Sequence, residues 1–225
     1  MLKAVLFDMD GVIVNTEPLH RKAYFQMFEE VGLDVIPDYY DGFTGQSTME
    51  ICRALCSRFE LDRKPEELLN IKRKHFKHLF ENSDGLKLID GVLDLIKDYH
   101  QKGMTLILAS SASMPNIDRI FDRFDLNPFF KAKISGADLK ASKPHPEIFI
   151  KAAELAGADR DECIVIEDST NGIIAAKEAG IFCVGYRGPN SSNQDFSRAD
   201  LVVTDFKEIA YDRLIGILEI GRAHV

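Results

Sequence analysis

The feature that most constrains this chain is a pair of aspartates directly after a short apolar run near the N-terminus. Ala4–Phe7 has the continuous apolar character of a strand buried on both faces, and Asp8 and Asp10 follow it at once. In open α/β sheets, ligands bind just beyond the carboxyl ends of the strands. Two carboxylates there indicate a hard cation and a nucleophile. An Asp-Gly turn that joins a hairpin is the alternative, because residues 12–14 are a second apolar run.

The composition is that of an ordinary globular chain with an excess of acid. Of the 225 residues, 45% are hydrophobic and 28% are charged, which suits one good-sized core or a domain with a smaller appendage. The net charge of -8 disfavours binding to nucleic acid or to an anionic membrane. A phosphorylated substrate therefore needs a local cationic site. No apolar stretch approaches the ~20 residues that span a bilayer.

The termini and the cysteines indicate a cytoplasmic protein. The first residues lead straight into a strand pattern, which predicts no signal peptide. None of the four cysteines forms a CxxC pair, so we expect reduced, mostly buried thiols and a cytoplasmic location. A monomer is the simplest expectation. Residues 219–225 break the preceding apolar pattern, and we interpret them as a candidate non-native tail outside the fold.

Short apolar runs alternate with helical patterns through most of the chain. The runs predict buried parallel strands at residues 4–7, 105–109, 163–166 and 182–185, with a fifth candidate at 201–203. The helical patterns lie at residues 91–102, 116–124, 146–156 and 171–179. This alternation predicts an α/β fold with a doubly wound parallel sheet of the Rossmann-like type.

The segment between residues 17 and 84 differs, because it has no convincing strand pattern. Its helical patterns run over residues 18–31, 48–59 and 65–80. We therefore predict a core formed by residues 1–16 and 85–218, with a small α-helical cap inserted at residues 17–84. An insertion directly after the first motif is expected to sit over the strand ends as a lid.

Two further motifs supply groups that bind phosphate. Ser110 and Ser111 follow the second predicted strand, where a hydroxyl and backbone N–H groups can hold phosphate oxygens. Lys143 lies between Ser142 and Pro144 ahead of a predicted helix and supplies local positive charge. Each motif also has a plainer interpretation, which is a solvated serine loop for the first and a surface lysine between prolines for the second.

A second acidic pair, Glu167 and Asp168, closes the apolar run at residues 163–166. Asp168 can join Asp8 in holding a divalent cation, and a site of oxygen ligands with few carboxylates suits Mg²⁺. The alternative is helix capping by Asp168 or Ser169. Capping accounts for one acid but not for a second pair that follows its strand as the first pair does.

In their order, the four motifs resemble those of the haloacid dehalogenase superfamily of phosphotransferases. The matching positions are Asp8-x-Asp10-Gly-Val, Ser110, Ser142-Lys143-Pro144 and Glu167-Asp168, and the resemblance covers essentially the whole chain. The inserted segment is similar to the small α-helical cap of one large subgroup. The residues that look closest to the β-phosphoglucomutase-like phosphatases and phosphomutases are 7–14, Thr16, His20, Ala109-Ser110 and 142–149.

This resemblance implies a mechanism through an aspartyl phosphate. Asp8 matches the nucleophile that attacks phosphorus. Asp10 matches the acid/base that protonates the leaving oxygen and then activates water or a second acceptor. Ser110, Ser111 and Lys143 match the groups that bind the transferring phosphoryl group. An aspartate at position 10 favours phosphate esters, because the dehalogenases and phosphonate-cleaving relatives lack one there.

The resemblance also implies a Mg²⁺ site and a set of cap residues. The metal ligands it gives are Asp8, Asp10, Glu167 and Asp168, with the backbone carbonyl of Met9. The cap residues that it places near the substrate or in domain closure are Thr16, His20, Gly45, Gln46 and Ser47. The expected partner is a small phosphorylated metabolite of the sugar-phosphate class.

The choice between phosphatase and mutase depends on the cap. A mutase must bind a second phosphate, and the mutase arginine falls on the loop that corresponds to residues 45–49, where this chain has none. Arg53 is the nearest, one helical turn on. The mutase lysine after the second-motif serine is also missing, since Ser113 and Met114 stand there, and Asn15 replaces the usual aspartate. We therefore favour a phosphatase and keep a phosphomutase as the alternative.

An alternative from another functional class is that the chain is a phospho-aspartate switch, like the receiver domains of signalling proteins, and not an enzyme. Receivers also gather acids, Mg²⁺ and a Lys-Pro loop at the strand ends of an α/β fold. They usually lack a helical insertion after the first strand, and their phosphate acceptor lies on a later strand than the acidic pair. In this chain Asp8 itself belongs to the first pair, which favours the enzyme.

Overall fold

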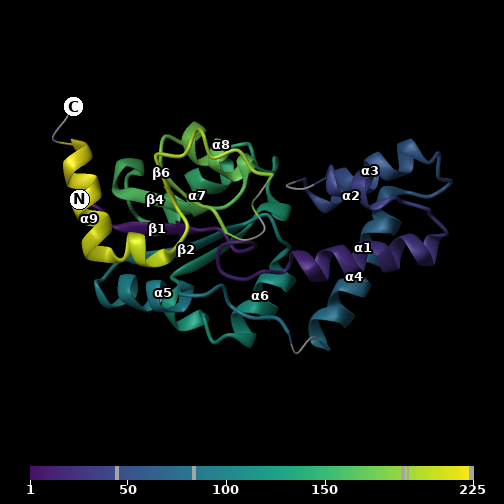
Figure 1. Cartoon of the computed structure of the whole chain (residues 1–225), viewed down its shortest axis with the longest axis horizontal. Coiled ribbons are helices and arrows are strands. Elements are labelled where there is room, and N and C mark those ends of the chain that lie inside the picture. Colours follow the sequence, from purple (N-terminus) through teal and green to yellow (C-terminus); the bar gives the residue numbers. More distant parts are fainter. Residues whose placement is uncertain (44–45, 83–84, 189–190, 192, 223–225) are drawn as a thin grey trace. The chain divides into compact units, whose positions relative to one another are not determined.

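The computed structural model describes residues 1–43, 46–82, 85–188, 191 and 193–222 (Figure 1). The chain divides into two compact units. We call Met1–Asn15 with Leu88–Val225 the core unit, and Thr16–Lys87 the cap unit. The predicted cap boundary at Asp84 lies outside the described residues.

A six-stranded parallel sheet forms the centre of the core unit (Figure 1). Its strands are β1 (Ala4–Phe7), β2 (Thr105–Ser110), β3 (Ala132–Ser135), β4 (Cys163–Glu167), β5 (Phe182–Tyr186) and β6 (Leu201–Val203). Their order in the sheet is β3-β2-β1-β4-β5-β6, and each neighbouring pair is parallel. The predicted doubly wound fold is confirmed. The chain order reverses beside β1, where such sheets bind their ligands.

The five strands predicted from apolar runs are confirmed, but β3 was not predicted. Its sequence, Ala-Lys-Ile-Ser, is interrupted by Lys133, and its first two residues are only half-buried because β3 lies at the sheet edge. The hairpin alternative for the first motif is wrong. Both neighbours of β1 are parallel strands, and Val14 makes only isolated bridges with Asp10 and Leu88.

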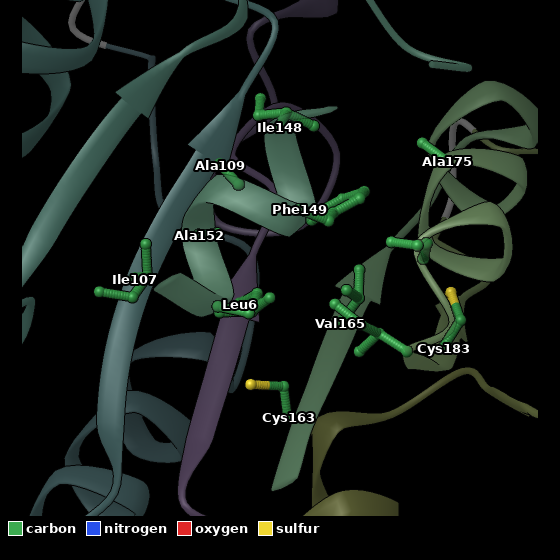
Figure 2. Packing of buried hydrophobic residues seen from close by; sticks show 14 of the residues in the cluster. Leu6, Ile107, Ala109, Ile148, Phe149, Ala152, Cys163, Val165, Ala175 and Cys183 are labelled. Carbon is green, nitrogen blue, oxygen red and sulfur yellow. The ribbon is translucent and has the colours of Figure 1, made fainter. Parts of the chain in front are cut away.

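Helices cover both faces of the sheet (Figure 1). Figure 2 shows Leu6, Ile107 and Val165 of three adjacent strands on the face covered by α7 (Glu147–Ala156) and α8 (Thr170–Glu178). Successive strand residues point to opposite faces. Phe7 therefore faces α5 (Val92–Gln101), where its ring lies 6.4 Å from that of Tyr99. Helix α6 (Met114–Arg123) packs on this second face near the sheet edge.

The cap unit is helical in its described residues. It contains α1 (Glu17–Val31), α2 (Pro37–Asp41), α3 (Thr48–Arg58) and α4 (Pro65–Glu81). The longest two, α1 and α4, make the most extensive helix pair, and Met27, Leu55 and Leu68 are fully buried among these helices. Helix α2 was not predicted, because a single turn after Pro37 leaves no periodic pattern to detect.

The last helix, α9 (Tyr211–Arg222), extends past residue 218. The first four residues of the candidate tail, 219–222, are therefore helical, although the apolar pattern breaks at Glu219. Residues 223–225 lie outside the described residues. Among the helices described, none has the length and apolar composition needed to cross a bilayer.

Leu6 tests the core of the central strand, because its side chain is fully buried. Leu6→Ala removes three buried carbons and leaves a cavity, so we expect a loss of about 2–5 kcal/mol in the free energy of unfolding. Urea unfolding at equilibrium measures this loss. Leu155→Ala is the matched control, since Leu155 is 47% exposed and its truncation should change stability by less than about 0.5 kcal/mol. Equal losses for the two variants would contradict the assignment of β1 to the core.

Candidate active site

The carboxyl ends of β1 and β4 bring Asp8 of the first acidic pair to both acids of the second pair. Phe7 is in register with Ile166, so Asp8 and Glu167 lie at neighbouring positions where these strands end. One carboxylate oxygen from each of Asp8, Glu167 and Asp168 lies within 4.8 Å of the other two. The topology thus gathers acids that are about 160 residues apart in the sequence, as expected for parallel strands that end at one edge.

Lys143 lies among these acids. Its Nζ donates to Asp8 Oδ1 at 2.6 Å, to Glu167 Oε1 at 2.6 Å and to the Ala109 carbonyl at 3.0 Å. A lysine ammonium has three N–H donors, and these contacts use all three. The residue is only 9% exposed, and its Nζ lies 4.8 Å from the centre of the Phe149 ring. The interpretation of Lys143 as a solvated surface lysine is therefore wrong.

Burial governs the electrostatics of this cluster. Burial is the largest cause that raises the pKa of Asp8, Lys143 opposes it, and repulsion from Glu167 and Asp10 adds to it, so that the pKa is about 8. Burial, with repulsion from Glu167 and Asp8, also raises the pKa of Asp168. Burial by itself would lower the pKa of Lys143, but Asp8 and Glu167 outweigh it and raise that pKa. The single ammonium of Lys143 thus lies among several closely spaced carboxyl groups. A further positive charge is needed to lower their pKa values so that all of them ionise at neutral pH.

This donor set fits Mg²⁺. The cluster offers carboxylate oxygens, which are the ligands that Mg²⁺ prefers, and its excess negative charge is what a divalent cation neutralises. The carboxylate of Asp10 is not part of the three-acid cluster found among the described residues. The Met9 carbonyl already accepts the amides of Ile13 at 2.9 Å and Val14 at 3.1 Å. Its use as a metal ligand would require one of these hydrogen bonds to break.

Glu167 is the most heavily hydrogen-bonded acid of the cluster. Its Oε1 accepts Lys143, and its Oε2 accepts the Asp168 amide, the Ser169 amide and the Ser169 hydroxyl, each at 2.9 Å. Ser169 also caps α8, because its Oγ accepts the Gly172 amide at 3.1 Å. The capping alternative is thus confirmed for Ser169. The same residue caps α8 and hydrogen-bonds the carboxylate of Glu167.

Two glycines make room for the acids. A Cβ on Gly11 would lie 1.9 Å from Asp168 Oδ2, and the φ of Gly11 is +90°. A Cβ on Gly172 would lie 1.8 Å from Glu167 Oε1. Sequence reasoning included Gly11 in the first motif but gave neither glycine the role of making room for an acid. The available signal was their place near the two acidic pairs, one residue after Asp10 and four residues after Asp168, where close approach of side chain to backbone requires glycine.

The loop after β2 carries the predicted phosphate-binding serines. Ser110 is buried, and its Oγ accepts the Ala112 amide at 3.1 Å. This bond uses a lone pair, so the hydroxyl proton can be donated in another direction. Ser111, next in the chain, is exposed. Ser135 at the end of β3 donates its hydroxyl to the Ala112 carbonyl at 2.8 Å. Ser135 was missed together with its strand.

The predicted cap residues belong to the cap unit, whereas the acid cluster belongs to the core unit. Thr16 is fully buried, and its carbonyl accepts the amides of Leu19 and His20 at the start of α1. Ser47 caps α3 in a reciprocal pair with Glu50, a structural role that we did not predict. Gln46 precedes it, with its amide donating to the Phe43 carbonyl at 3.0 Å. Gly45 lies outside the described residues.

His20 is the cap residue with the most specific surroundings. Its Nδ1 lies 2.6 Å from Lys72 Nζ, and its ring stacks on Phe76 at 4.3 Å between centroids. Burial, with the Lys72 charge, lowers the pKa of His20 well below its usual value. An ammonium only donates, so a protonated Lys72 pairs with the tautomer of neutral His20 that carries its proton on Nε2. Lys72 is itself 2% exposed.

The doubly wound sheet and the buried charged cluster at its switch point are those of an α/β enzyme. The chain belongs to the haloacid dehalogenase-like hydrolase family, whose model matches residues 5–186. The resemblance stated from the motifs is therefore confirmed at the level of the family.

Similar proteins include both phosphatases and mutases. A phosphorylated carbohydrates phosphatase of Thermotoga maritima is 32% identical over 180 residues, which are 80% of this chain and 82% of the relative. The β-phosphoglucomutase of Bacillus subtilis is 28% identical over 218 residues, 95% of this chain and 94% of the relative. The crystal structure of CbbY from Rhodobacter sphaeroides in complex with phosphate is 27% identical, with a TM-score of 0.82 over 93% of this chain and 96% of that chain.

Gly172 tests the packing that holds Glu167. Gly172→Ala places a methyl group where the carboxylate lies, so Glu167 must move and its partners lose their hydrogen bonds. We expect a loss of about 1–3 kcal/mol in the free energy of unfolding and a smaller rise in Tm on addition of Mg²⁺. Urea unfolding and thermal scans measure both effects. Gly216→Ala in α9 is the control, because a Cβ there meets nothing within 4 Å. Parent stability and a parent response to Mg²⁺ in Gly172→Ala would contradict this account.

Proposed function

We propose that this protein is a Mg²⁺-dependent phosphatase of a small phosphorylated metabolite of the sugar-phosphate class, acting through an aspartyl phosphate on Asp8. The observation that carries the proposal is the buried contact of 2.6 Å between Lys143 Nζ and Asp8 Oδ1 inside the acid cluster. A carboxylate held in this way is fixed in position beside a positive charge, which is what transfer of a phosphoryl group to it requires.

The first step is attack of Asp8 on phosphorus. A bond forms between a carboxylate oxygen of Asp8 and phosphorus while the bond from phosphorus to the ester oxygen breaks. Asp10 gives a proton to that leaving oxygen. The Lys143 ammonium stabilises the charge on the phosphoryl oxygens, since its bond to Asp8 keeps it next to the reacting atoms. Mg²⁺, held by Asp8 and Asp168 with Glu167 beside them, would supply the remaining positive charge.

The second step releases phosphate and regenerates Asp8. Asp10, now without its proton, takes one from a water molecule that attacks phosphorus, and the bond from phosphorus to Asp8 breaks. The hydroxyl of Ser110 and the backbone at Ser111 hold phosphoryl oxygens through both steps. The free donor direction of the Ser110 hydroxyl supports this role, because its lone pair is already used by the Ala112 amide.

Water is the acceptor favoured by the cap sequence. A mutase needs a cation for a second phosphate, and residues 45–49 contain no arginine or lysine. The relative from Thermotoga maritima, a phosphatase of phosphorylated carbohydrates at 32% identity, supports the same choice. A phosphomutase is the second candidate. The mutase relative at 28% identity favours it, and buried Lys72 of the cap unit is then the candidate cation for the distal phosphate.

Asp8→Asn tests the nucleophile. The amide is a far poorer nucleophile than the carboxylate, so we expect kcat/KM for phosphate esters to fall by at least about 1,000-fold. Steady-state kinetics in Mg²⁺ buffer measure the fall, and a thermal scan shows whether the variant is folded. Asp212→Asn, at a side chain 82% exposed, is the control with the same chemical change. Turnover by Asp8→Asn at the parent rate would mean that Asp8 is not the nucleophile.

A paired assay on one sample decides between the two candidate reactions. One arm follows phosphate release from a panel of sugar phosphates with Mg²⁺. The other follows glucose 6-phosphate formed from β-glucose 1-phosphate with a bisphosphate primer. We expect phosphate release without isomerisation, and loss of that release after chelation of the metal, because the acid cluster needs a divalent cation. Isomerisation with little release would establish the mutase, and release that survives chelation would contradict the metal assignment.

A further inference from the structure

We call residues 110–112 the phosphoryl loop. Hydrogen bonds to both backbone groups of Ala112, its amide and its carbonyl, hold this loop in place. The Ala112 amide donates to Ser110 Oγ at 3.1 Å, and the Ala112 carbonyl accepts the Ser135 hydroxyl at 2.8 Å. The first bond lies within the loop. The second comes from a different strand and ties the loop to the sheet.

The end of β3 is built to make this contact. Ser135 is in register with Ser110, so the two serines lie side by side at the carboxyl ends of neighbouring strands. Ser135 is 2% exposed. A Cβ on the next residue, Gly136, would lie 3.2 Å from the Ser111 Cα and 3.3 Å from the Ser110 carbonyl oxygen. The glycine therefore lets the chain after β3 lie directly against the phosphoryl loop.

This contact is important for binding because the phosphoryl loop supplies hydrogen-bond donors, and these bind a phosphoryl group best when they are oriented before it binds. Loops at strand ends are otherwise mobile. Donors that are already fixed need no reorganisation when charge develops on the ligand, and this makes them effective. Holding Ala112 by its carbonyl restrains the backbone of Ser111 and the side chain of Ser110 together.

We propose that Ser135 is a positioning residue for phosphoryl binding, acting through the Ala112 carbonyl to hold Ser110 and Ser111 in the binding conformation. Ser135 itself does not touch the phosphoryl group. This inference rests on the proposed function, since it assumes that the phosphoryl loop binds phosphate. The proposal gives a function to the carboxyl end of β3, which carries none of the four motifs.

The competing explanation is that Ser135 only satisfies a loop carbonyl. The core unit contains a matched case of that kind. Ser191 is also 2% exposed, and its hydroxyl donates to the Gly188 carbonyl at 2.8 Å in the loop after β5. Ser135→Ala and Ser191→Ala thus delete the same group, with the same burial and the same type of bond. Only the first deletion reaches the phosphoryl loop.

The experiment compares the two variants with the parent in Mg²⁺ buffer. It measures kcat and KM for three phosphate esters with different leaving groups, the inhibition constant of inorganic phosphate, and Tm. For Ser135→Ala we expect the inhibition constant to rise about tenfold. We also expect kcat/KM to fall by one common factor for all three esters, because every ester shares the phosphoryl group. The Tm should fall about as much in both variants, while Ser191→Ala keeps the parent values for phosphate and for turnover.

Two results would overturn the inference. One is a folded Ser135→Ala whose phosphate inhibition and kcat/KM stay within twofold of the parent. The other is equal weakening of phosphate binding in Ser191→Ala. If Ser135→Ala does not fold, Gly136→Ala tests the same contact, because its methyl group presses on the Ser111 Cα and should weaken phosphate inhibition in the same way. A parent that releases phosphate from no ester refutes the proposed function and this inference with it, whereas an active parent with an unaffected Ser135→Ala refutes this inference alone.

Discussion

The buried ammonium of Lys143, held between Asp8 and Glu167, is the interaction on which the rest of the core unit's site depends. Removing charged groups from water is costly, and a buried ion pair contributes little net stability unless its geometry is excellent. Here each N–H of the ammonium has an acceptor within 3.0 Å, from residues that follow or belong to three different strands. The pair is therefore better explained by function than by stability. It fixes the carboxylate of Asp8, the proposed nucleophile, where three strands end and leaves the cluster short of positive charge.

The close packing around this cluster explains constraints that lie outside it. Asp168 lies so near the backbone at Gly11, and Glu167 so near the backbone at Gly172 in α8, that no side chain fits at either glycine. Glu167 is oriented on its other side by Ser169, which also begins α8. One turn thus ends a strand, begins a helix and aims two acids. A change at either glycine acts on the charges indirectly, through the position of the carboxylate that it displaces.

The parts of the fold and site that could be predicted are those with a continuous sequence signal. Buried parallel strands give apolar runs, and the acids where those runs end predicted Asp8, Glu167 and Asp168. Lys143 was predicted from its place between Ser142 and Pro144, and the structure brings all four residues together. Strand β3 gave no such run, because an edge strand tolerates the half-buried Lys133, and its terminal Ser135 was lost with it. Hydrogen bonding could not be predicted either. The Met9 carbonyl is already used within its own turn, a fact that no residue pattern encodes.

The relatives show where the remaining specificity must lie. Relatives of similar sequence identity to this chain include a phosphatase and a phosphoglucomutase. A phosphatase transfers the phosphoryl group to water, whereas a phosphoglucomutase transfers it to a sugar hydroxyl. In this chain the proposed transfer to Asp8 precedes either reaction, so the motif residues of the core unit do not by themselves select the acceptor. Selection must come from groups outside the four motifs. The cap unit carries the difference on which the proposed choice of acceptor rests, because residues 45–49 contain no arginine or lysine to hold a second phosphate.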